Sequence, residues 1–444
     1  MSECLIPVVK FRLTFIRKWC FLAACVVICL GVWGWAERVL IPANTLAAQA
    51  KRVPMGNNSD LYPRWLGARE LLLYHRDPYS TEVTRDIQRG FYGREIDLRN
   101  PNDPRDQAAF AYPVYVVFLL VPFLKFPFVA VQAAFRWLLL VGIAATIPAW
   151  MRAIGSRTSP RWLLSAMVLA IGTYPAVLEF HMQNLAALVA VFLAFSAAAA
   201  ACDQLVLSGF LLALATIKPQ LSVLFVLCFL VWTAGCWLQR KRLALSFAAT
   251  LLALVVAGEI ILPHWLTKFF DAAEAYRSYA SDPSILQFAF GNTISWLAAI
   301  SLCGGLLFVA VQYRKYPASS AEFAWCLACA ATVTLTILPV TVYNQVLLVP
   351  ALLPLWLQIH EASDLLPRSL AKACFACLGW QWITAAILAI CSLWVAPERL
   401  RGWARLPLLT LIALPPLALL AVAAALIVRQ ITTPIPQSLA VSHE

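Results

Sequence analysis

The chain has 444 residues, of which 62% are apolar and 13% charged, and its mean hydropathy is +0.77. A soluble domain is about 45–50% apolar and about 25% charged, so this composition excludes a soluble globular enzyme, a disordered chain and a collagen-like chain. It predicts an all-α polytopic membrane protein, because β-barrel strands would give only short alternating segments. The net charge of +12 predicts an excess of Lys and Arg in cytoplasmic loops rather than a nucleic-acid-binding surface.

The chain opens with a basic segment, 1–19, that we expect to stay in the cytoplasm. The apolar run 20–35 follows it without a small-residue cleavage site, so we interpret this run as a retained signal anchor. The longest polar stretch, 42–109, comes next and holds ten Lys or Arg and nine Asp or Glu. Loops this long are translocated largely regardless of charge, so we expect 42–109 to form the first outer loop.

Apolar runs close to membrane length fill the rest of the chain. They lie near 112–124, 128–150, 162–178, 185–201, 204–217, 220–238, 243–262, 293–312, 323–339, 345–359, 373–394 and 406–429. Clusters of Lys and Arg between these runs favour the cytoplasmic side of a membrane. The clusters are Arg152/Arg157/Arg161, Arg240/Lys241/Arg242, Arg314/Lys315 and Arg368/Lys372.

These clusters share one side only if 112–150 crosses the membrane once. The piece 112–124, which contains Pro113 and Pro122, is then predicted to be re-entrant or interfacial. This map gives about 12 transmembrane helices, with a range of 11–13, and places both termini inside. The basic stretch 399–405 falls outside in this map, which leaves open a miscount near the C-terminus.

Polar residues interrupt several apolar runs, and the map places these interruptions on the outer face. They occur in the first loop, at 181–184, at 218–219, over 263–292 and at 343–345. Polar groups inside or at the edge of a membrane are functional candidates by default. Their convergence on one face predicts a site on the extracytoplasmic side.

Asp60 begins a predicted short helix after the first apolar run, and two compatible roles fit it. An Asp at a helix start accepts backbone N–H bonds, and Pro63 near the first turn favours this N-cap role. The alternative is a general base that takes a proton from a hydroxyl nucleophile. Asp77, which precedes Pro78, is predicted to be a structural turn residue.

Lys218 ends an apolar run directly before Pro219. A lysine at a helix end often extends its ammonium group to the membrane surface. In this map Lys218 lies on the outer face, where an isolated cation has no topological role. It could instead bind a lipid phosphate and neutralise that phosphate as it leaves. Both interpretations stay open.

Side-chain amides mark three further breaks in the apolar runs, at Gln183 and Asn184, at Asn292, and at Asn344 and Gln345. Amides at helix ends often cap backbone groups. Three such sites on one face could instead hydrogen-bond the hydroxyl groups of a sugar.

Tyr112 is predicted to be a tyrosine of the membrane interface, with a contact to a polar headgroup as the alternative. The lone histidines, His181 and His264, are interpreted as neither ligands nor bases. No Walker loop, Rossmann glycine pattern, HExxH or GxSxG motif is present. We therefore expect no cofactor.

No bound metal is expected either. The chain has thirteen cysteines, but the two CxxC spacings, 326–329 and 374–377, lack the second pair or histidine that a zinc site needs. We interpret the cysteines as packing residues. No acidic cluster accompanies Asp60, although Asp103 and Asp106 lie in the same loop and could overturn this expectation.

Several of these motifs occur in an order typical of one group of enzymes. They are Asp60-Leu61-Tyr62 through Gly67-Ala68-Arg69, Asp77-Pro78-Tyr79, Tyr112-Pro113 with Pro122, Gln183-Asn184, Lys218-Pro219 and Asn292-Thr293-Ile294-Ser295. In these features, over roughly residues 20–360, the chain resembles glycosyltransferase family 87, the polyprenyl-phosphate-mannose-type transferases of the GT-C superfamily. The chain departs from the family in having Val114 after Pro113, where a second proline is common, and no histidine over 341–345.

The resemblance implies an inverting transfer of a sugar from a polyprenyl-phosphate-linked donor. The expected sugar is a hexose, mannose; in some family members it is the pentose arabinofuranose. The acceptor would be a hydroxyl of a lipid or glycan on the outer face of the plasma (inner) membrane. Asp60 would be the catalytic base and Lys218 the ligand of the donor phosphate. Sugar or acceptor contacts would come from Tyr62, Arg64, Gln183, Asn184, Tyr112, Asn292, Asn344 and Gln345.

We therefore expect three parts: a cytoplasmic N-terminus over 1–19, a catalytic membrane module over 20–360, and further transmembrane helices with a tail over 361–444. Two other functions stay open, a transporter or flippase of a lipid-linked sugar and an inactive relative of the family. A transporter typically shows internal repeats and polar residues near the midplane of the membrane. The sequence shows no internal repeat, and its polar residues gather at one face.

Overall fold

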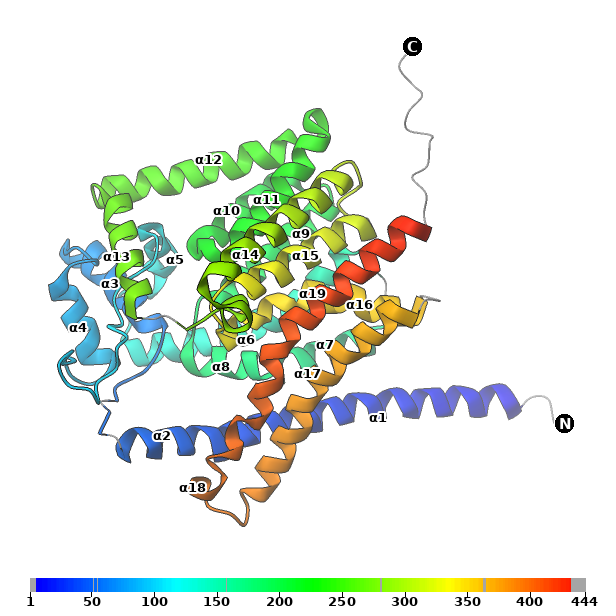
Figure 1. Ribbon diagram of the computed structural model, residues 1–444, viewed down its shortest axis with the longest axis horizontal. Helices are drawn as coiled ribbons and strands as arrows, with labels where there is room; N and C mark the ends of the chain where they lie inside the picture. Colours follow the sequence, from blue (N-terminus) through cyan, green and yellow to red (C-terminus); the bar gives the residue numbers. More distant parts are fainter. Residues whose placement is uncertain are drawn as a thin grey trace.

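The computed structural model describes residues 5–50, 52–53, 55–156, 158–279, 282–361 and 365–432. These residues are all-α, as predicted, apart from one isolated β-bridge between Ser284 and Pro339. A rod of helices lies along one edge of a central bundle, and a small cluster of short helices lies at one end of it (Figure 1).

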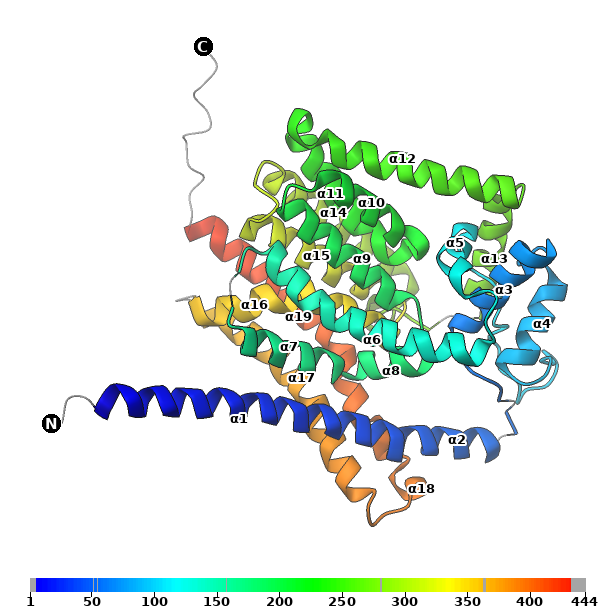
Figure 2. The same cartoon turned by 180° about the vertical axis from the view of Figure 1, so that it is seen from behind.

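The rod consists of α1 (Leu5–Trp35), the π-helical turn η1 (Ala36–Leu40) and α2 (Ile41–Ala50), which run on without a break (Figure 2). It extends beyond the predicted run 20–35 because apolar residues continue through η1, where Ala36, Val39 and Leu40 are buried.

The central bundle is formed by helices of very different lengths. They are α6 (Phe128–Ala153), α7 (Pro160–Ile171), α8 (Tyr174–Met182), α9 (Ala186–Ala201), α10 (Leu205–Leu214), the 3-10 turn η4 (Ala215–Ile217), α11 (Pro219–Gly235), α14 (Ile285–Tyr313), α15 (Ala321–Ile337), the 3-10 helix η5 (Val342–Leu348) and α16 (Val349–Glu361). The remaining C-terminal elements are α17 (Leu365–Cys391), α18 (Pro397–Leu400), η6 (Trp403–Arg405) and α19 (Leu406–Thr432). The long helix α12 (Trp237–Ile261) lies at the edge of the bundle opposite α1 (Figures 1 and 2).

The number of membrane spans differs from the prediction. Six of the described helices are long and apolar enough to cross a membrane, namely Trp19–Ala50, Phe128–Ala153, Trp237–Ile261, Ile285–Tyr313, Arg368–Cys391 and Trp403–Val428. The pair α7 and α8, bent by 59°, makes a seventh if it is counted as one span. The prediction of about 12 spans (range 11–13) is therefore wrong. Prolines and polar residues break several apolar runs into helices of 10–17 residues, which is short of the roughly 20 residues that a span needs.

Two of the predicted cytoplasmic clusters meet at one end of the bundle. The buried guanidinium group of Arg240 donates hydrogen bonds to the backbone carbonyls of Arg314 and Tyr316, at 2.6 and 2.8 Å. It also stacks on the ring of Trp232, 3.9 Å from the ring centroid. The start of α12 is thus joined to the turn between α14 and α15, so these two clusters lie at the same end of the bundle.

The polar interruptions lie at the other end of the same helices. Asn184 lies two residues before the start of α9, and Lys218 directly precedes α11. These helices have 16 and 17 residues, which corresponds to about 24–26 Å of helix. The basic turns and the polar residues are therefore separated by most of the thickness of a hydrocarbon core, which is about 30 Å.

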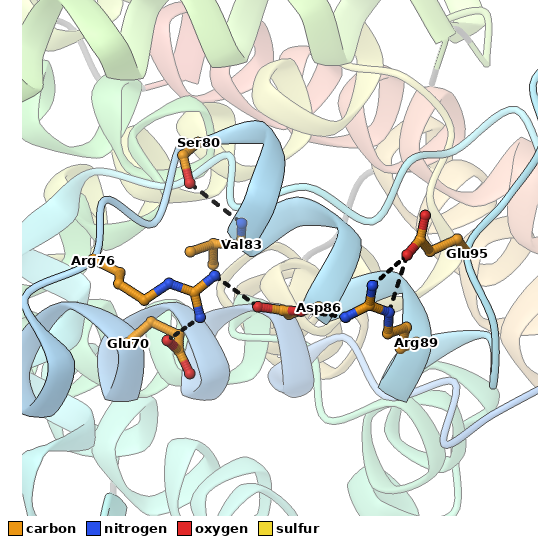
Figure 3. Close-up of polar contacts among 7 residues, drawn as sticks. All are labelled: Glu70, Arg76, Ser80, Val83, Asp86, Arg89 and Glu95. Carbon is orange, nitrogen blue, oxygen red and sulfur yellow. Dashed lines mark hydrogen bonds and ion pairs between the residues drawn. The ribbon is translucent and has the colours of Figure 1, made fainter.

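The cluster at the end of the molecule contains α3 (Leu61–Tyr74), α4 (Thr81–Phe91) and α13 (Trp265–Tyr279) (Figure 1). Helices α3 and α4 are joined by a chain of ion pairs with N···O distances of 2.6–2.8 Å (Figure 3). The chain runs Glu70, Arg76, Asp86, Arg89 and Glu95. Ser80 caps α4 by accepting the Val83 N–H. These contacts fix α3, and Asp60 stands immediately before it.

The piece predicted to be re-entrant forms only short helices. They are η2 (Val114–Val116), α5 (Val117–Leu120) and η3 (Val121–Phe123). This segment is too short to cross a membrane, in agreement with the prediction. The hydroxyl of Tyr115 donates to the carbonyl of Thr216 at 2.9 Å, which attaches the segment to the turn before Lys218.

Candidate active site

Asp60 is not the N-cap that its position predicts. Its backbone is already helical, and its side chain makes no capping hydrogen bond to α3. Oδ2 of Asp60 instead accepts a hydrogen bond of 2.7 Å from the side-chain amide of Asn184. The Asp60 N–H donates to the carbonyl of Met182, also at 2.7 Å. The end of α8 therefore turns the carboxylate away from its own helix.

Asn184 connects the carboxylate to a buried cation. Its Oδ1 accepts hydrogen bonds from Nζ of Lys218 at 3.0 Å and from the Ala186 N–H at 2.9 Å. Its Nδ2 donates to Asp60, so every polar atom of this amide is used. One side chain thus holds Asp60 and Lys218 close together, although they are far apart in the sequence.

Lys218 is held by a second amide on its other side. Nζ donates to Oδ1 of Asn344 at 3.1 Å and lies 5.0 Å from the centroid of the Tyr343 ring. Asn344 in turn donates to the hydroxyl of Thr341. Lys218 is only 6% exposed, so its ammonium group does not extend to the surface and the snorkelling interpretation is wrong. An ammonium group has three donors, and the described residues use two of them.

The environment of Lys218 changes its acidity. The residue lies between η4 and α11, outside the candidate spans. Burial lowers the pKa of Lys218 to about 8, and the nearby carboxylates of Glu179 and Asp60 offset part of this effect. At neutral pH the ammonium form therefore prevails, and it is poised to lose its proton in mildly alkaline solution.

Arg64 places a second cation beside Asp60. Nη1 of Arg64 donates to the backbone carbonyl of Asp60 at 2.7 Å, and its guanidinium carbon lies 4.2 Å from the centroid of the Tyr112 ring. Tyr112 is 5% exposed, so it is a wall of the site rather than an interface tyrosine. Burial raises the pKa of Tyr112 to about 12, which keeps its hydroxyl protonated at neutral pH. The hydroxyl can therefore serve as a donor to a substrate.

The other predicted amides face away from the cations. Gln183, in the left-handed conformation that ends α8, accepts from the hydroxyl of Ser59 at 2.6 Å and from Gln132 at 3.0 Å, and it donates to the carbonyl of Phe180. Gln345 donates to the carbonyl of Leu411 in α19 at 2.7 Å. Both amides hydrogen-bond neighbouring helices. No described contact tests whether they bind a sugar, so that role stays a prediction.

Among the described residues, no hydrogen bond, ion pair or ring contact joins Tyr62 or Asn292 to Asp60 or Lys218. The ring of Tyr62 packs edge-on against Phe128, and its hydroxyl fills the space above Gly90 of α4. Asn292 is exposed and follows Gly291, whose φ of 73° breaks α14. Their role in substrate binding stays a prediction.

Asp77 is a turn residue, as predicted. Its Oδ1 accepts the N–H of Tyr79 at 2.9 Å. Its Oδ2 forms an ion pair of 2.8 Å with Lys268 of α13. The turn therefore also attaches α13 to the cluster that carries Asp60.

Two further acidic residues lie near these groups; sequence reasoning missed Glu179 and named Asp106 only as an acid that could contribute to a metal site. Glu179, on α8, is completely buried and interacts electrostatically with Lys218 and Asp60. Asp106 interacts with Asp60 and Arg64, and burial raises the pKa of its carboxyl. A signal for Glu179 was present, because an acid inside an apolar helix is itself a functional candidate.

Asp103 is the other acid that the sequence offered for a metal site, and hydrogen bonds within the protein already use its carboxylate. Asp103 accepts from Arg94 at 2.7 Å and from the Asp97 N–H at 2.7 Å. Within the described ranges, no three His, Cys, Asp or Glu residues are arranged to hold a metal ion. The described cysteines are free thiols, and Cys326 and Cys329 are buried in α15. This fits their predicted packing role.

The fold and the site together define a helical membrane protein with a carboxylate and two cations gathered at one end of its bundle. The family model of glycosyltransferase family 87 matches residues 110–341, which is more than half of the chain. The chain therefore belongs to glycosyltransferase family 87 and is a membrane glycosyltransferase with a sugar donor and an acceptor. The match includes Asn184 and Lys218, whereas Asp60 and Asn344 lie beyond its ends. No curated protein and no solved structure matches the chain.

Proposed function

We propose that this glycosyltransferase moves a hexose, with mannose the expected sugar, from a polyprenyl-phosphate-linked donor to an acceptor hydroxyl with inversion. One observation supports this proposal above all others: Asp60 and Lys218 hydrogen-bond to the same side chain, Asn184. A base and a phosphate-binding cation are the two groups that a direct displacement needs.

In the proposed reaction, Asp60 takes the proton of the acceptor hydroxyl while the acceptor oxygen attacks the anomeric carbon. The bond between that carbon and the phosphate oxygen breaks, and polyprenyl phosphate leaves with one additional negative charge. Oδ1 of Asp60 accepts no hydrogen bond from any described residue, so it is available for the proton. The charge of the sites balances, because the carboxylate becomes neutral as the phosphate becomes a dianion.

Two cations are available for the leaving phosphate. Lys218 has one N–H that no described residue uses, and Nε of the Arg64 guanidinium group is buried without a hydrogen-bond partner. Fixed charges that face a developing oxyanion in a water-poor site stabilise it strongly, because they need no reorganisation. Tyr112 and Asn344 flank these cations and are the proposed contacts for the sugar.

A lipid-linked donor agrees with the position of the site. The site lies at the end of a bundle whose candidate spans expose apolar faces, including Val129 and Ile260, which are 77% and 76% exposed. A prenyl chain cannot leave the lipid, so an enzyme that uses it must meet it there. The basic turns at the opposite end support an extracytoplasmic active site in the plasma membrane.

We propose that the catalytic module extends over 20–360, beyond the family match on both sides. Asp60 and Asn344 both contribute to the site and lie outside 110–341. The module would follow a cytoplasmic N-terminus, 1–19, and precede the C-terminal helices of 361–444.

A donor screen tests this proposal. The purified protein, in lipid nanodiscs, is incubated with polyprenyl-phosphate-mannose, its arabinofuranose counterpart and a nucleotide sugar, together with a glycolipid extract as acceptor. We expect consumption of polyprenyl-phosphate-mannose and a product with inverted anomeric configuration, measured by mass spectrometry and NMR. Consumption of the arabinofuranose donor alone would overturn the choice of a hexose. Consumption of the nucleotide sugar alone, or retention of configuration, would overturn the whole proposal.

A further inference from the structure

The turn between α17 and α19 carries a group of arginines that the proposed displacement does not use. Arg399, Arg401 and Arg405 lie in or beside α18 and η6, and all three side chains are exposed. They belong to the stretch 399–405 that the span map placed outside, against the usual bias of Lys and Arg towards the cytoplasm. This departure from the bias points to a role other than setting the orientation of the chain.

A fourth arginine comes to the same place from the N-terminal rod. The turn η1, which contains Arg38, packs against both α18 and η6. Figures 1 and 2 show α18 beside the rod, near α2 and away from the N-terminus. Among the described residues, no salt bridge joins any of these four arginines to an acid, and the neighbouring Glu37 pairs with His181 at 3.1 Å. Four unpaired positive charges therefore gather here, and we call them the arginine group.

The lengths of the helices place the arginine group at a membrane surface. About 30 Å of helix separates Lys18 from Arg38, and α17 extends for a similar length from Lys372 to its last residue. Each length matches a hydrocarbon core, which is about 30 Å thick. Trp394 and Trp403, which are 78% and 61% exposed, border the turn as tryptophans do at the level of lipid headgroups. The arginine group therefore lies at headgroup level, on the surface opposite Lys18 and Lys372.

A groove between α1 and α17 extends to the arginine group. Its volume is about 380 Å³, which is in the range of about 300–1,000 Å³ found for small-molecule pockets. Gly31 and Gly34 of α1 face Ala386 and Ala389 of α17, so small residues form its floor. Among the residues that line the groove, Arg38 alone is charged, and it is the last of those that the rod contributes. The groove is thus an apolar slot with a cation at the end nearest the turn.

We propose that the groove and the arginine group together bind one anionic phospholipid. An acyl chain would lie between α1 and α17, and the headgroup phosphate would lie between Arg38 and the arginines of the turn. Guanidinium groups bind phosphate through charge-assisted, often bidentate, hydrogen bonds. A zwitterionic lipid fits less well, because its own cation would face these arginines. The bound lipid would join the rod to the C-terminal helices.

This lipid is neither the donor nor the acceptor of the proposed transfer. The residues that surround Asp60 and Lys218 come from other elements than α1, η1 and α17. The inference therefore stands apart from the proposed function, and its tests need no turnover.

Native mass spectrometry of the delipidated full-length protein tests the proposal. The affinity of the first bound lipid is measured for phosphatidylglycerol and for phosphatidylcholine, with inorganic phosphate and polyprenyl phosphate as competitors. Hydrogen bonds to charged groups are strong enough for about a tenfold preference, so we expect phosphatidylglycerol to bind about tenfold more tightly. Equal affinities would overturn the proposal. Displacement of phosphatidylglycerol by inorganic phosphate, or by an equal concentration of polyprenyl phosphate, would also overturn it.

Variants of the arginines test the headgroup contact. Arg38→Gln should lower the affinity for phosphatidylglycerol about tenfold and leave that for phosphatidylcholine within about twofold. The triple variant R399Q/R401Q/R405Q should do the same. All four side chains are exposed, so we expect these variants to fold. The control is Arg242→Gln, which removes an exposed arginine from α12. An equal loss in this control would show a general effect of net charge and would overturn the site.

A variant of the groove tests the contact with the acyl chain. A Cβ at Gly34 would lie 3.7 Å from that of Ala389, which is an ordinary contact, so Gly34→Leu should fold and fill the groove. We expect it to weaken the binding of both phospholipids. The matched control is Gly305→Leu on α14, where nothing lies within 4 Å of an added Cβ. Wild-type lipid binding in Gly34→Leu, or an equal loss in Gly305→Leu, would contradict the assignment of the groove.

Thermal unfolding gives a second readout. A ligand that binds only the folded state raises its stability by mass action. Phosphatidylglycerol should therefore raise the unfolding midpoint of the wild-type protein and should have little effect on that of R399Q/R401Q/R405Q. An equal shift in the two proteins would overturn the proposed site.

Discussion

Two groups of charged residues lie on or beside α3, and they use their charges in opposite ways. In the α3–α4 ion-pair chain, every acid directly contacts a base at 2.6–2.8 Å, and the arginines are 39–60% exposed (Figure 3). In the proposed active site, the amide of Asn184 hydrogen-bonds both Asp60 and Lys218, and no salt bridge joins these two residues. The directly paired charges hold two helices together. In the proposed site, the intervening amide leaves one carboxylate oxygen of Asp60 and one N–H of Lys218 available for a substrate.

Among the replacements that test this comparison, that of Asp60 should have the largest effect on the rate of transfer. Asp60→Asn keeps the shape of the side chain but removes the base, and general-base catalysis contributes about 10²–10⁴-fold. We expect a loss of that size in kcat, with thermal stability close to that of the wild type, measured by donor turnover and by thermal unfolding. A variant with a tenth or more of the wild-type rate would remove Asp60 as the base.

Replacing Lys218 should have the next largest effect. Lys218→Met removes the buried cation while filling similar space, and loss of one group that stabilises a developing oxyanion costs about 10²–10³-fold in kcat. We also expect weaker binding of polyprenyl phosphate, measured with the purified protein. Wild-type affinity for polyprenyl phosphate in Lys218→Met would contradict the assigned role.

The pH dependence of kcat/KM should test whether Lys218 is the cation that binds the donor phosphate. Since burial lowers the pKa of Lys218 to about 8, kcat/KM should fall about tenfold per pH unit above that value as the free enzyme loses this proton. Stability should move in the opposite direction. Between about pH 8 and the ordinary lysine pKa of 10.5, the unfolded chain binds more protons than the folded one, so unfolding becomes harder as the pH rises.

The control for this pH effect is Lys218→Arg. A guanidinium group stays charged throughout this range, so the alkaline fall in kcat/KM should disappear even if the overall rate is lower. If kcat/KM of Lys218→Arg still falls above about pH 8, another group must titrate there.

The smallest effect is expected from the ion-pair chain. Arg76→Ala removes the partner of Glu70 and Asp86, but exposed ion pairs contribute little and are screened by salt. We expect turnover within roughly twofold of the wild type, measured in the same donor assay. A loss comparable to that of Lys218→Met would show that charge alone, rather than its separation by an amide, decides which group is functional.

The sequence predicted several of these residues from two kinds of evidence. Asn184, Lys218 and Asn344 each interrupt or border an apolar run, whereas Asp60 begins a predicted helix inside the long polar stretch 42–109. The structure joins all four by hydrogen bonds. A polar group is expensive inside an apolar environment, so such interruptions are informative without any knowledge of distances. The same reasoning applied to Glu179 would have added it.

The sequence could not separate neighbouring amides from one another. Gln183 and Asn184 are adjacent and similar in chemistry, but Gln183 supports the backbone around Ser59 while Asn184 joins Asp60 to Lys218. Their different directions follow from the left-handed conformation of Gln183, with φ of 51°, which only the packing of the helix end selects.

The sequence by itself determined that this is an α-helical membrane protein, and its motifs identified glycosyltransferase family 87. Composition and hydrophobic runs set these properties because they are sums along the chain, and they do not depend on which helix contacts which. Only the tertiary structure decided the number of long spans and the partner of each charge. Those depend on where a helix bends and on which groups from distant segments share a buried space, and hydropathy does not record either.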